Sequence, residues 1–188
     1  MVDECAKQWD CTGWNDPVQM LNSTKVDVVY ISTPIGVHFS LAKQAIKAGK
    51  HVWCEKPLTC SYADTQTLVS LAKESGKVLT ESFMYLYHPQ FYRVKKFVND
   101  SKQIHSVVCR FGIPALDKPG FRDNSKLCGG ALWDVATYTT SAVLSLFPDQ
   151  QVEVLFSEVL TKETSSVDTE GRTVLRFSKG TTAYLEWG

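Results

Sequence analysis

Residues 26–58, VDVVYISTPIGVHFSLAKQAIKAGKHVWCEKPL, decide the fold of this chain. The stretch opens with the nearly continuous apolar run 26–31, which is typical of a strand covered on both faces of its sheet. Apolar residues then recur at helical spacing over 37–48, and Gly49 provides the C-terminal stop. A second short strand follows at 51–54. Two strands joined by one short helix predict a parallel pair with a right-handed crossover.

The flanking sequence first extends this unit and then changes character. A helix begins at Asp16-Pro17, and another helix and strand follow the stretch above at 61–75 and 78–80. Beyond them we expect helices over 88–98 and 130–147, and strands over 104–111, 151–160, 173–177 and 182–187. The predicted fold class is therefore α/β. An incomplete Rossmann-type parallel sheet over residues 1–84 precedes an α+β domain with a mostly antiparallel sheet over residues 85–188.

Composition and charge exclude several classes of function. The chain has 188 residues, of which 44% are hydrophobic, as in ordinary globular proteins. Its 20 Lys and Arg balance its 20 Asp and Glu, so no net field attracts nucleic acid or an anionic membrane. No apolar run reaches the roughly 18 residues of a membrane span, and the N-terminus is acidic where a signal peptide is basic and then apolar. We therefore expect a cytoplasmic protein with neither kind of partner.

The cysteines and histidines suggest no metal site. The six cysteines include no CxxC pair, which argues against both a zinc site and a disulfide framework, and we expect reduced thiols. A metal site built from the histidines is an alternative, but their spacings match no ligand motif. These histidines are His38, His51, His88 and His105.

Candidate functional residues follow the predicted parallel strands. Ligands bind outside the carboxyl ends of such strands, which here are followed by 32–38, by Glu55-Lys56-Pro57 and by Glu81. Lys56 precedes a proline, so its backbone is kept out of the α region and its ammonium is held ready to donate to a substrate hydroxyl. The alternative is a solvated Glu-Lys pair in a tight turn.

The predicted helix over 130–147 carries a second constellation. Asp134 and Tyr138 are four residues apart and therefore share one helical face. Such a pair can bind and deprotonate a sugar-like hydroxyl. The alternative is a packing tyrosine with a hydrogen-bonded partner.

These motifs resemble those of a known family. Thr33, Pro34 and His38, followed by AGKHVWCEKP at 48–57, stand in register with T-P-x-x-x-H and A-G-K-H-V-x-x-E-K-P, the hallmark of the glucose-fructose oxidoreductase and inositol dehydrogenase (Gfo/Idh/MocA) family. The segments ESFMYLYHPQF and FRDNSKLCGGALWDVATY are similar to its dihydrodiol and xylose dehydrogenase branch. The resemblance covers nearly the whole chain.

The resemblance implies an oxidoreductase that uses NAD or NADP. Hydride would pass between the nicotinamide and a sugar, a polyol or a trans-dihydrodiol-like hydroxyl. Lys56 and Tyr138 would be catalytic, with the Lys56 ammonium favouring the Tyr138 phenolate, and the Lys56-Pro57 bond would be cis. Asp134 and Arg122 would bind the substrate. The cofactor would be bound by Thr33, Pro34, His38, Glu55, Lys56 and Glu81.

The chain also departs from the family pattern. It lacks a G-x-G-x-x-G turn with its helix, so we expect roughly 40 to 60 residues of the family's first βαβ unit to be missing, and the far end stops directly after a strand. We therefore expect weak cofactor binding by this chain. The alternative function is that of a catalytically inactive, truncated family member that acts only through protein association. In either case the resemblance implies a homo-oligomer formed through the C-terminal sheet.

Overall fold

The computed structural model describes residues 2–188 and contains two sheets. The first is parallel, in the order β1 (Val28–Ile31), β2 (His51–Glu55), β3 (Leu79–Ser82). The second has the order β4-β7-β6-β5. Its strands are β4 (Ser106–Phe111), β5 (Val152–Leu160), β6 (Glu170–Phe177) and β7 (Thr182–Trp187). Only the β4–β7 pair of this sheet is parallel, so the predicted fold class is confirmed.

Helices cover one face of the parallel sheet. α3 (His38–Lys47) and α4 (Tyr62–Glu74) follow β1 and β2, and both pack on the face that buries Val29, Ile31 and Val52. The short helices α1 (Val2–Gln8) and α2 (Pro17–Leu21) come before this sheet in the chain. The Asp16 carboxylate accepts a hydrogen bond from the Val18 amide, so the predicted helix start is confirmed.

The opposite face of the parallel sheet is open, and the expectation of a strand covered on both faces is wrong. Val28 and Tyr30 of β1 are 55% and 51% exposed, and Trp53 of β2 is 49% exposed. Both crossover helices lie on the other face, so the sheet alternates buried and exposed residues as a one-sided sheet does. Apolar β-branched residues favour a strand whether or not both faces are covered, so the run was correctly predicted as a strand.

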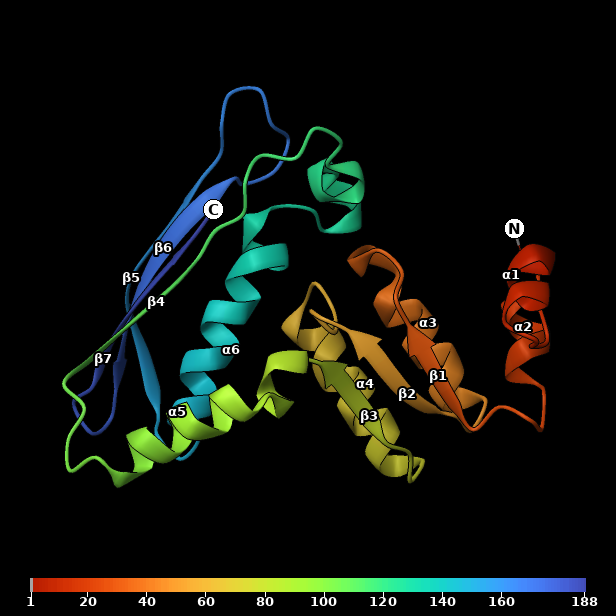
Figure 1. Ribbon diagram of the computed structural model, residues 1–188, viewed down its shortest axis with the longest axis horizontal. Coiled ribbons are helices and arrows are strands. Elements are labelled where there is room, and N and C mark those ends of the chain that lie inside the picture. Colours follow the sequence, from red (N-terminus) through yellow and green to blue (C-terminus); the bar gives the residue numbers. More distant parts are fainter. Residues whose placement is uncertain (1) are drawn as a thin grey trace.

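The second sheet is also covered on one face. α5 (Pro89–Asp100) and α6 (Thr137–Leu146) lie on the side toward the first sheet, and α6 is between the two sheets (Figure 1). Val143 of α6 packs in one cluster with Phe177, Leu185 and Trp187 of the sheet. This second hydrophobic core therefore lies between α6 and the second sheet, on the side of that sheet that faces the first sheet (Figure 1).

The long helix predicted over 130–147 consists of two parts. Leu132–Ala136 form a π-helical turn, and α6 continues from Thr137. Four 3-10 turns lie in the loops, at Ile35–Val37, Met84–Tyr87, Gly120–Asp123 and Ser125–Leu127. π-Helical turns interrupt α-helices most often at functional sites, and this one contains Asp134.

One expectation about the cysteines is wrong. Cys60 and Cys128 form a disulfide across a sequence separation of 68 residues. Folding brings the two together, and no local spacing shows it. The other four cysteines are free, with Cys54 buried and Cys5 and Cys11 exposed. Within residues 2–188, no helix is long and apolar enough to cross a membrane, and no three His, Cys, Asp or Glu side chains are grouped as metal ligands.

Candidate active site

An ion cluster joins the two halves of the molecule. Lys56, at the end of β2, donates from Nζ to the Asp134 carboxylate at 2.9 Å and also to the Asp134 carbonyl oxygen. Arg122 Nε donates to the other carboxylate oxygen at 2.7 Å. The Lys56 and Asp134 side chains are only 11% and 15% exposed. The structure thus brings together three of the predicted site residues, from the end of β2, the π-helical turn and a 3-10 turn.

The cluster keeps Asp134 ionised. Burial by itself would raise the pKa of this carboxyl group, but hydrogen bonds from Lys56 and Arg122 and the charges of both side chains outweigh that effect and hold the pKa below its usual value. One carboxylate is shared by two basic side chains. The cluster therefore favours an electron-rich oxygen or an anion as its next partner.

Tyr138 lies beside the same cluster. Lys56 Nζ is 4.6 Å from the centroid of the Tyr138 ring, so the two side chains that the resemblance implies are catalytic lie side by side. The rings of Phe83, Tyr85 and Phe111 surround it at centroid distances of 5.9, 6.2 and 5.4 Å. The hydroxyl contacts Met84 Sδ at 3.9 Å. The aromatic enclosure holds the ring in one orientation.

The expectation that the Lys56 ammonium favours a Tyr138 phenolate is wrong. Burial raises the pKa of Tyr138, and the negative charges of Glu55 and Asp134 and the neighbouring Tyr85 raise it further. The ammonium lies over the ring face and bonds to Asp134 instead of the hydroxyl. The Tyr138 phenol therefore stays protonated near neutral pH.

A cleft of about 800 Å³ opens beside these residues. Besides the ion cluster and Tyr138, it is lined by three of the predicted cofactor residues, Thr33, Pro34 and Glu55. Glu55 accepts a hydrogen bond from the Tyr30 hydroxyl, which fixes the carboxylate at the strand end. The side chains at the ends of β1 and β2 thus line the same cleft as Arg122 and Asp134, at the carboxyl ends of the parallel strands, where ligands bind in sheets of this kind.

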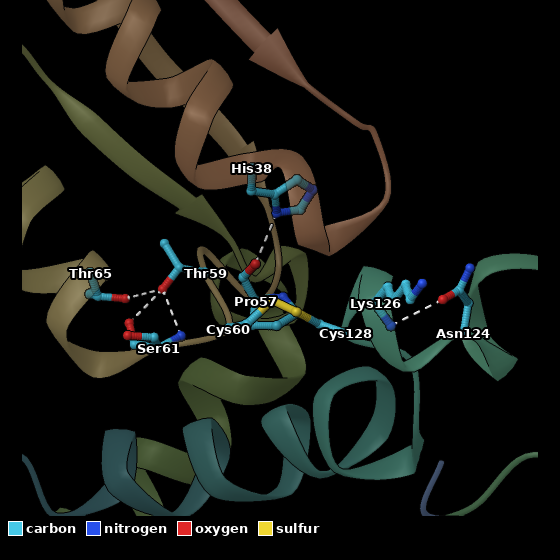
Figure 2. Close-up of a disulfide and its surroundings, with 9 residues drawn as sticks. All are labelled: His38, Pro57, Thr59, Cys60, Ser61, Thr65, Asn124, Lys126 and Cys128. Atoms are coloured by element: carbon cyan, nitrogen blue, oxygen red, sulfur yellow. Dashed lines mark hydrogen bonds between the residues drawn. A yellow bond between two sulfur atoms is a disulfide. The ribbon is translucent and has the colours of Figure 1, made fainter. Parts of the chain in front are cut away.

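His38 does not line the cleft. Its side chain is fully buried, with Nδ1 2.9 Å from the Pro57 carbonyl oxygen and Nε2 2.8 Å from the Thr33 carbonyl oxygen. Figure 2 shows the ring directed at Pro57. Carbonyl oxygens accept hydrogen bonds, so the imidazole ties the loops after β1 and β2 together. The structure places His38 behind the cleft as a support for Lys56. The Lys56-Pro57 bond is cis, as expected.

Glu81 also lies behind the cleft. Its carboxylate accepts a hydrogen bond from the Leu58 amide at 2.8 Å. Burial raises the pKa of Glu81, while the Leu58 amide and the charge of His38 act in the opposite direction. Glu81 therefore supports the turn that carries Lys56, and it is not among the residues that line the cleft.

Sequence reasoning missed a further residue that positions the site. The Asp168 carboxylate accepts a hydrogen bond from the Leu132 amide at 2.6 Å, and its carbonyl accepts one from the Ala131 amide at 3.0 Å. Gly130 has φ +109°, and a Cβ there would lie 2.1 Å from an Asp168 carboxylate oxygen. Asp168 thus caps the start of the π-helical turn that carries Asp134. It lies in the loop between β5 and β6, where no local pattern indicates it.

The apolar wall of the cleft was also missed. It is formed by Phe111, Ile113, Pro114, Leu116 and Phe121. Most of these residues come from an irregular segment after β4, which has neither helical nor strand periodicity. The only signal for this wall in the sequence is that the strand predicted over 104–111 ends where the wall begins. The wall gives the cleft an apolar surface beside its ion cluster, with the Arg122 guanidinium 4.7 Å from the centroid of the Phe121 ring.

Two family models match the chain. One describes an oxidoreductase family with an NAD-binding Rossmann fold and matches residues 2–83, and the other describes the GFO/IDH/MocA C-terminal domain and matches residues 93–188. The chain belongs to the Gfo/Idh/MocA oxidoreductase family. Its site residues stand in the two matched parts, Lys56 in the first and Asp134 and Tyr138 in the second.

The relatives include enzymes that act on sugars. The chain is 31% identical over 189 residues to dTDP-3,4-didehydro-2,6-dideoxy-alpha-D-glucose 3-reductase of Saccharopolyspora spinosa, covering 100% of this chain and 57% of the relative. It is 32% identical over 177 residues to D-xylose 1-dehydrogenase (NADP(+)) 2 of Haloferax volcanii, covering 93% and 54%. The structure of KijD10, a 3-ketoreductase from Actinomadura kijaniata solved with NADP and TDP-benzene, matches with a TM-score of 0.91 and 28% identity, covering 100% of this chain and 58% of KijD10. The chain thus spans a little over half the length of these relatives.

Proposed function

We propose that this protein is an NAD(P)-dependent oxidoreductase that interconverts a hydroxyl and a carbonyl group on a sugar, a polyol or a related small molecule. One observation carries the proposal: Lys56, Asp134 and Tyr138 meet in one cleft at the carboxyl ends of the parallel strands. Family membership and the sugar-converting relatives support it. The same convergence of site residues leaves the catalytically inactive alternative without support.

The cleft fits the nicotinamide end of the cofactor. Thr33, Pro34 and Glu55 form its strand-end side, where the Rossmann arrangement places a nicotinamide cofactor, and they leave an open volume beside the ion cluster. Bound NAD or NADP would supply or accept the hydride. The residues of this chain would orient the substrate against it and manage the proton.

Tyr138 is proposed as the general acid for carbonyl reduction. Its raised pKa keeps the phenol protonated near neutral pH, so it can donate a proton to the oxygen on which negative charge develops. In the reverse direction, oxidation of the alcohol, the substrate hydroxyl would give its proton to Tyr138. Tyr138 must then be a phenolate, and this favours alkaline pH. The reductive direction is therefore the one that this site favours near neutrality.

Lys56 and its partners are proposed to hold the substrate oxygen. An ammonium group has three donors, and two of those on Lys56 already bond to Asp134, which leaves one for the substrate. Arg122 is 41% exposed and lines the same cleft, so its free guanidinium nitrogens face further polar groups of the substrate. Asp134 fixes both basic side chains in place.

The open face of the second sheet supports the proposal of a homo-oligomer. Val108, Tyr184, Val174 and Phe156 are paired in register across all four strands and form one apolar row. Three of them, Val108, Tyr184 and Phe156, are 69%, 47% and 48% exposed. No helix among the described residues covers this face in Figure 1. A second copy of the chain is the proposed occupant, because a self-complementary row suits a two-fold interface.

The division into a cofactor-binding part, residues 1–84, and a substrate and assembly part, residues 85–188, also remains a proposal, as does a cytoplasmic location. The cofactor-facing Thr33, Pro34 and Glu55 come from the first part.

Disulfides are rare in the cytoplasm and are usually reversible there. In a cytoplasmic location the Cys60–Cys128 bond would form only transiently.

Substitution of the tyrosine tests the proposed function. NADPH and NADH oxidation would be followed with a dTDP-linked 3-keto sugar, and NADP reduction with D-xylose. Tyr138→Phe should lower kcat by at least about 100-fold because the proton donor is lost. Tyr87→Phe is the matched control, since Tyr87 is 67% exposed and lies outside the cleft. Equal rates for the two variants would contradict the assignment.

A further inference from the structure

The Cys60–Cys128 disulfide lies directly beside the candidate active site. Cys60 is in the loop that begins at Lys56-Pro57, and Cys128 follows the 3-10 turn Ser125–Leu127 (Figure 2). The two Cα atoms are 6.2 Å apart. The bond therefore connects the loop after β2 to the segment that leads into the π-helical turn.

The disulfide and the ion cluster join the same two segments. Cys60 follows Lys56 by four residues, and Cys128 precedes Asp134 by six. Lys56 and Asp134 are themselves paired at 2.9 Å. The disulfide and the Lys56–Asp134 ion pair thus both connect the loop after β2 to the segment that leads into the π-helical turn, a region called the junction below. Breaking the disulfide would allow Lys56 and Asp134 to move apart more easily.

The segments within this ring are well anchored, so they transmit a change at the sulfur atoms. The Pro57 carbonyl is held by His38, and the Thr59 hydroxyl bonds to Thr65 and to the Ser61 carbonyl. On the other side, the Gly130 amide donates to the Arg122 carbonyl at 2.9 Å. Arg122 in turn holds Asp134.

The backbone at Cys128 points to a role for its sulfur. Cys128 has φ 57°, a left-handed conformation that glycine adopts freely and other residues adopt at a cost. Its neighbour Leu127 lies so close to the loop after β1 that a Cβ on Gly36 would be 2.8 Å from the Leu127 Cα. A cysteine in a place that favours glycine, at the point where the two halves touch, is explained by the bond that it makes.

The disulfide is also the accessible redox group near the cleft. Cys60 and Cys128 are both partly exposed, whereas Cys54 is fully buried. Burial raises the pKa of Cys54 to about 12, and burial also raises the pKa of Cys109. The reactive thiolate form of these two cysteines is therefore scarce at neutral pH, so a thiol reagent attacks them slowly.

We propose that Cys60–Cys128 is a site of reversible thiol–disulfide exchange with a dithiol reductant, and that its redox state controls how firmly Lys56 is held against Asp134. The effect on catalysis rests on the function proposed above. The exchange itself does not.

A dithiol reductant opens the Cys60–Cys128 bond in two steps. A thiolate of the reductant attacks one sulfur of the pair, the S–S bond breaks, and its electron pair leaves with the other cysteine sulfur, which takes up a proton. The second thiol of the reductant then displaces the first cysteine as a thiol. The protein gains two electrons and two protons, and the reductant becomes a disulfide. Glutathione disulfide reverses the reaction and leaves two molecules of glutathione.

The exchange is tested first without any activity assay. The full chain carrying Cys5→Ser and Cys11→Ser, which removes the two exposed thiols, would be equilibrated with mixtures of reduced and oxidised dithiothreitol. Alkylation and mass spectrometry would then count the thiols. We expect interconversion of one Cys60–Cys128 disulfide with two thiols while Cys54 and Cys109 stay unmodified. Failure of the pair to re-form with glutathione disulfide, or equal modification of all four cysteines, would overturn the proposal.

Hydrogen exchange tests the effect on the junction. Amides in 56–61 and 125–134 should exchange at least about threefold faster in the reduced protein, because the covalent tie restrains local opening. Amides in β5 serve as the internal reference, since this strand lies outside both segments and pairs with β6. Equal exchange at the junction in the two redox states would contradict the proposed control.

Two variants connect the bond to catalysis. Cys60→Ser and Cys128→Gly each abolish the disulfide. Glycine also suits the left-handed backbone at position 128, so Cys128→Gly relieves a backbone cost that Cys60→Ser leaves in place. Both should show kcat/KM about tenfold below that of the oxidised protein and no response to reductant, while Cys109→Ala keeps the response. A response that persists in both variants would overturn the assignment. If no variant and no wild-type protein oxidises NAD(P)H, the proposed function fails, while the thiol count and the exchange rates still decide the redox proposal.

Discussion

Ion pairs occur both at the junction of the two halves beside the cleft, where Lys56 meets Asp134, and on the open face of the second sheet, but the two places differ in burial. At the junction, Lys56 and Asp134 are paired with 11% and 15% of their side chains exposed. On the open face, Arg110 and Glu186 are paired at 2.7 Å with 69% and 54% exposed. Water and salt screen the second pair much more than the first. Burial and covalent support, more than the number of ion pairs, therefore distinguish a site from a surface.

The largest expected effect comes from the disulfide. Cys60→Ser should lower the free energy of unfolding by about 4 kcal/mol, because the bond closes a loop of 68 residues in the unfolded chain. Urea denaturation of the variant and of the oxidised parent measures the difference. Cys109→Ala provides the comparison for loss of a free thiol. A difference below about 1 kcal/mol would show that the junction needs no covalent support.

Removal of the shared carboxylate should have the next largest effect. Asp134→Asn leaves Lys56 and Arg122 without their anion, and we expect a loss of about 2 to 3 kcal/mol in the free energy of unfolding. Asp100→Asn is the matched control, since Asp100 pairs with Lys96 on the surface, where both are over half exposed. The control should change stability by less than about 0.5 kcal/mol. Similar losses in the two variants would remove the distinction between junction and surface.

The pH dependence of stability sharpens the same point. The pKa of Asp134 is lower in the folded protein than its ordinary value of 3.8, so its ion pairs stabilise the fold at pH above 3.8, and this contribution is lost as the pH falls through the folded pKa. Unfolding would be measured from pH 5 to pH 2 for the parent and Asp134→Asn. The two curves should converge at the acid end. Parallel curves would mean that Asp134 contributes nothing that depends on its charge.

How far sequence reasoning reached depends on where each residue stands relative to a regular element. Thr33 and Lys56 were predictable because each directly follows a strand within one contiguous motif. Asp168 was not, because it lies in the β5–β6 loop, 36 residues beyond Leu132 of the π-helical turn, and only the fold brings the two together. The Cys60–Cys128 disulfide was missed for the same reason, since 68 residues separate its two cysteines in the sequence. The open face at Val28 was missed because a run of apolar residues does not reveal on which side its helices pack.

A smaller effect is expected when the open face of the second sheet is changed. Tyr184→Lys places a charge in the middle of the apolar row and should weaken self-association by about tenfold, or about 1.4 kcal/mol, with little change in the unfolding of the monomer. Analytical ultracentrifugation over a range of concentrations measures it. Glu74, exposed in α4 and outside this sheet, provides the control variant Glu74→Lys. A parent chain that is monomeric at all concentrations would contradict the proposed assembly.

The smallest effect should come from the surface ion pair. Glu186→Gln removes the partner of Arg110 and should change the free energy of unfolding by less than about 0.5 kcal/mol. Urea denaturation at low and at high salt measures it, and the small difference should disappear at high salt. A loss as large as that of Asp134→Asn would show that exposure is the wrong criterion.

Hydride transfer at the cleft is tested most directly with a labelled cofactor. The protein would be incubated with NADPH or NADH deuterated at the transferable position of nicotinamide C4 and with a keto sugar, and the product would be analysed by NMR and mass spectrometry. The proposed function predicts one deuterium bound to the carbinol carbon of the product, formed by the parent and by Tyr87→Phe and at least about 100-fold more slowly by Tyr138→Phe. A product that carries no deuterium, or equal labelling rates for Tyr138→Phe and the parent, would contradict the account.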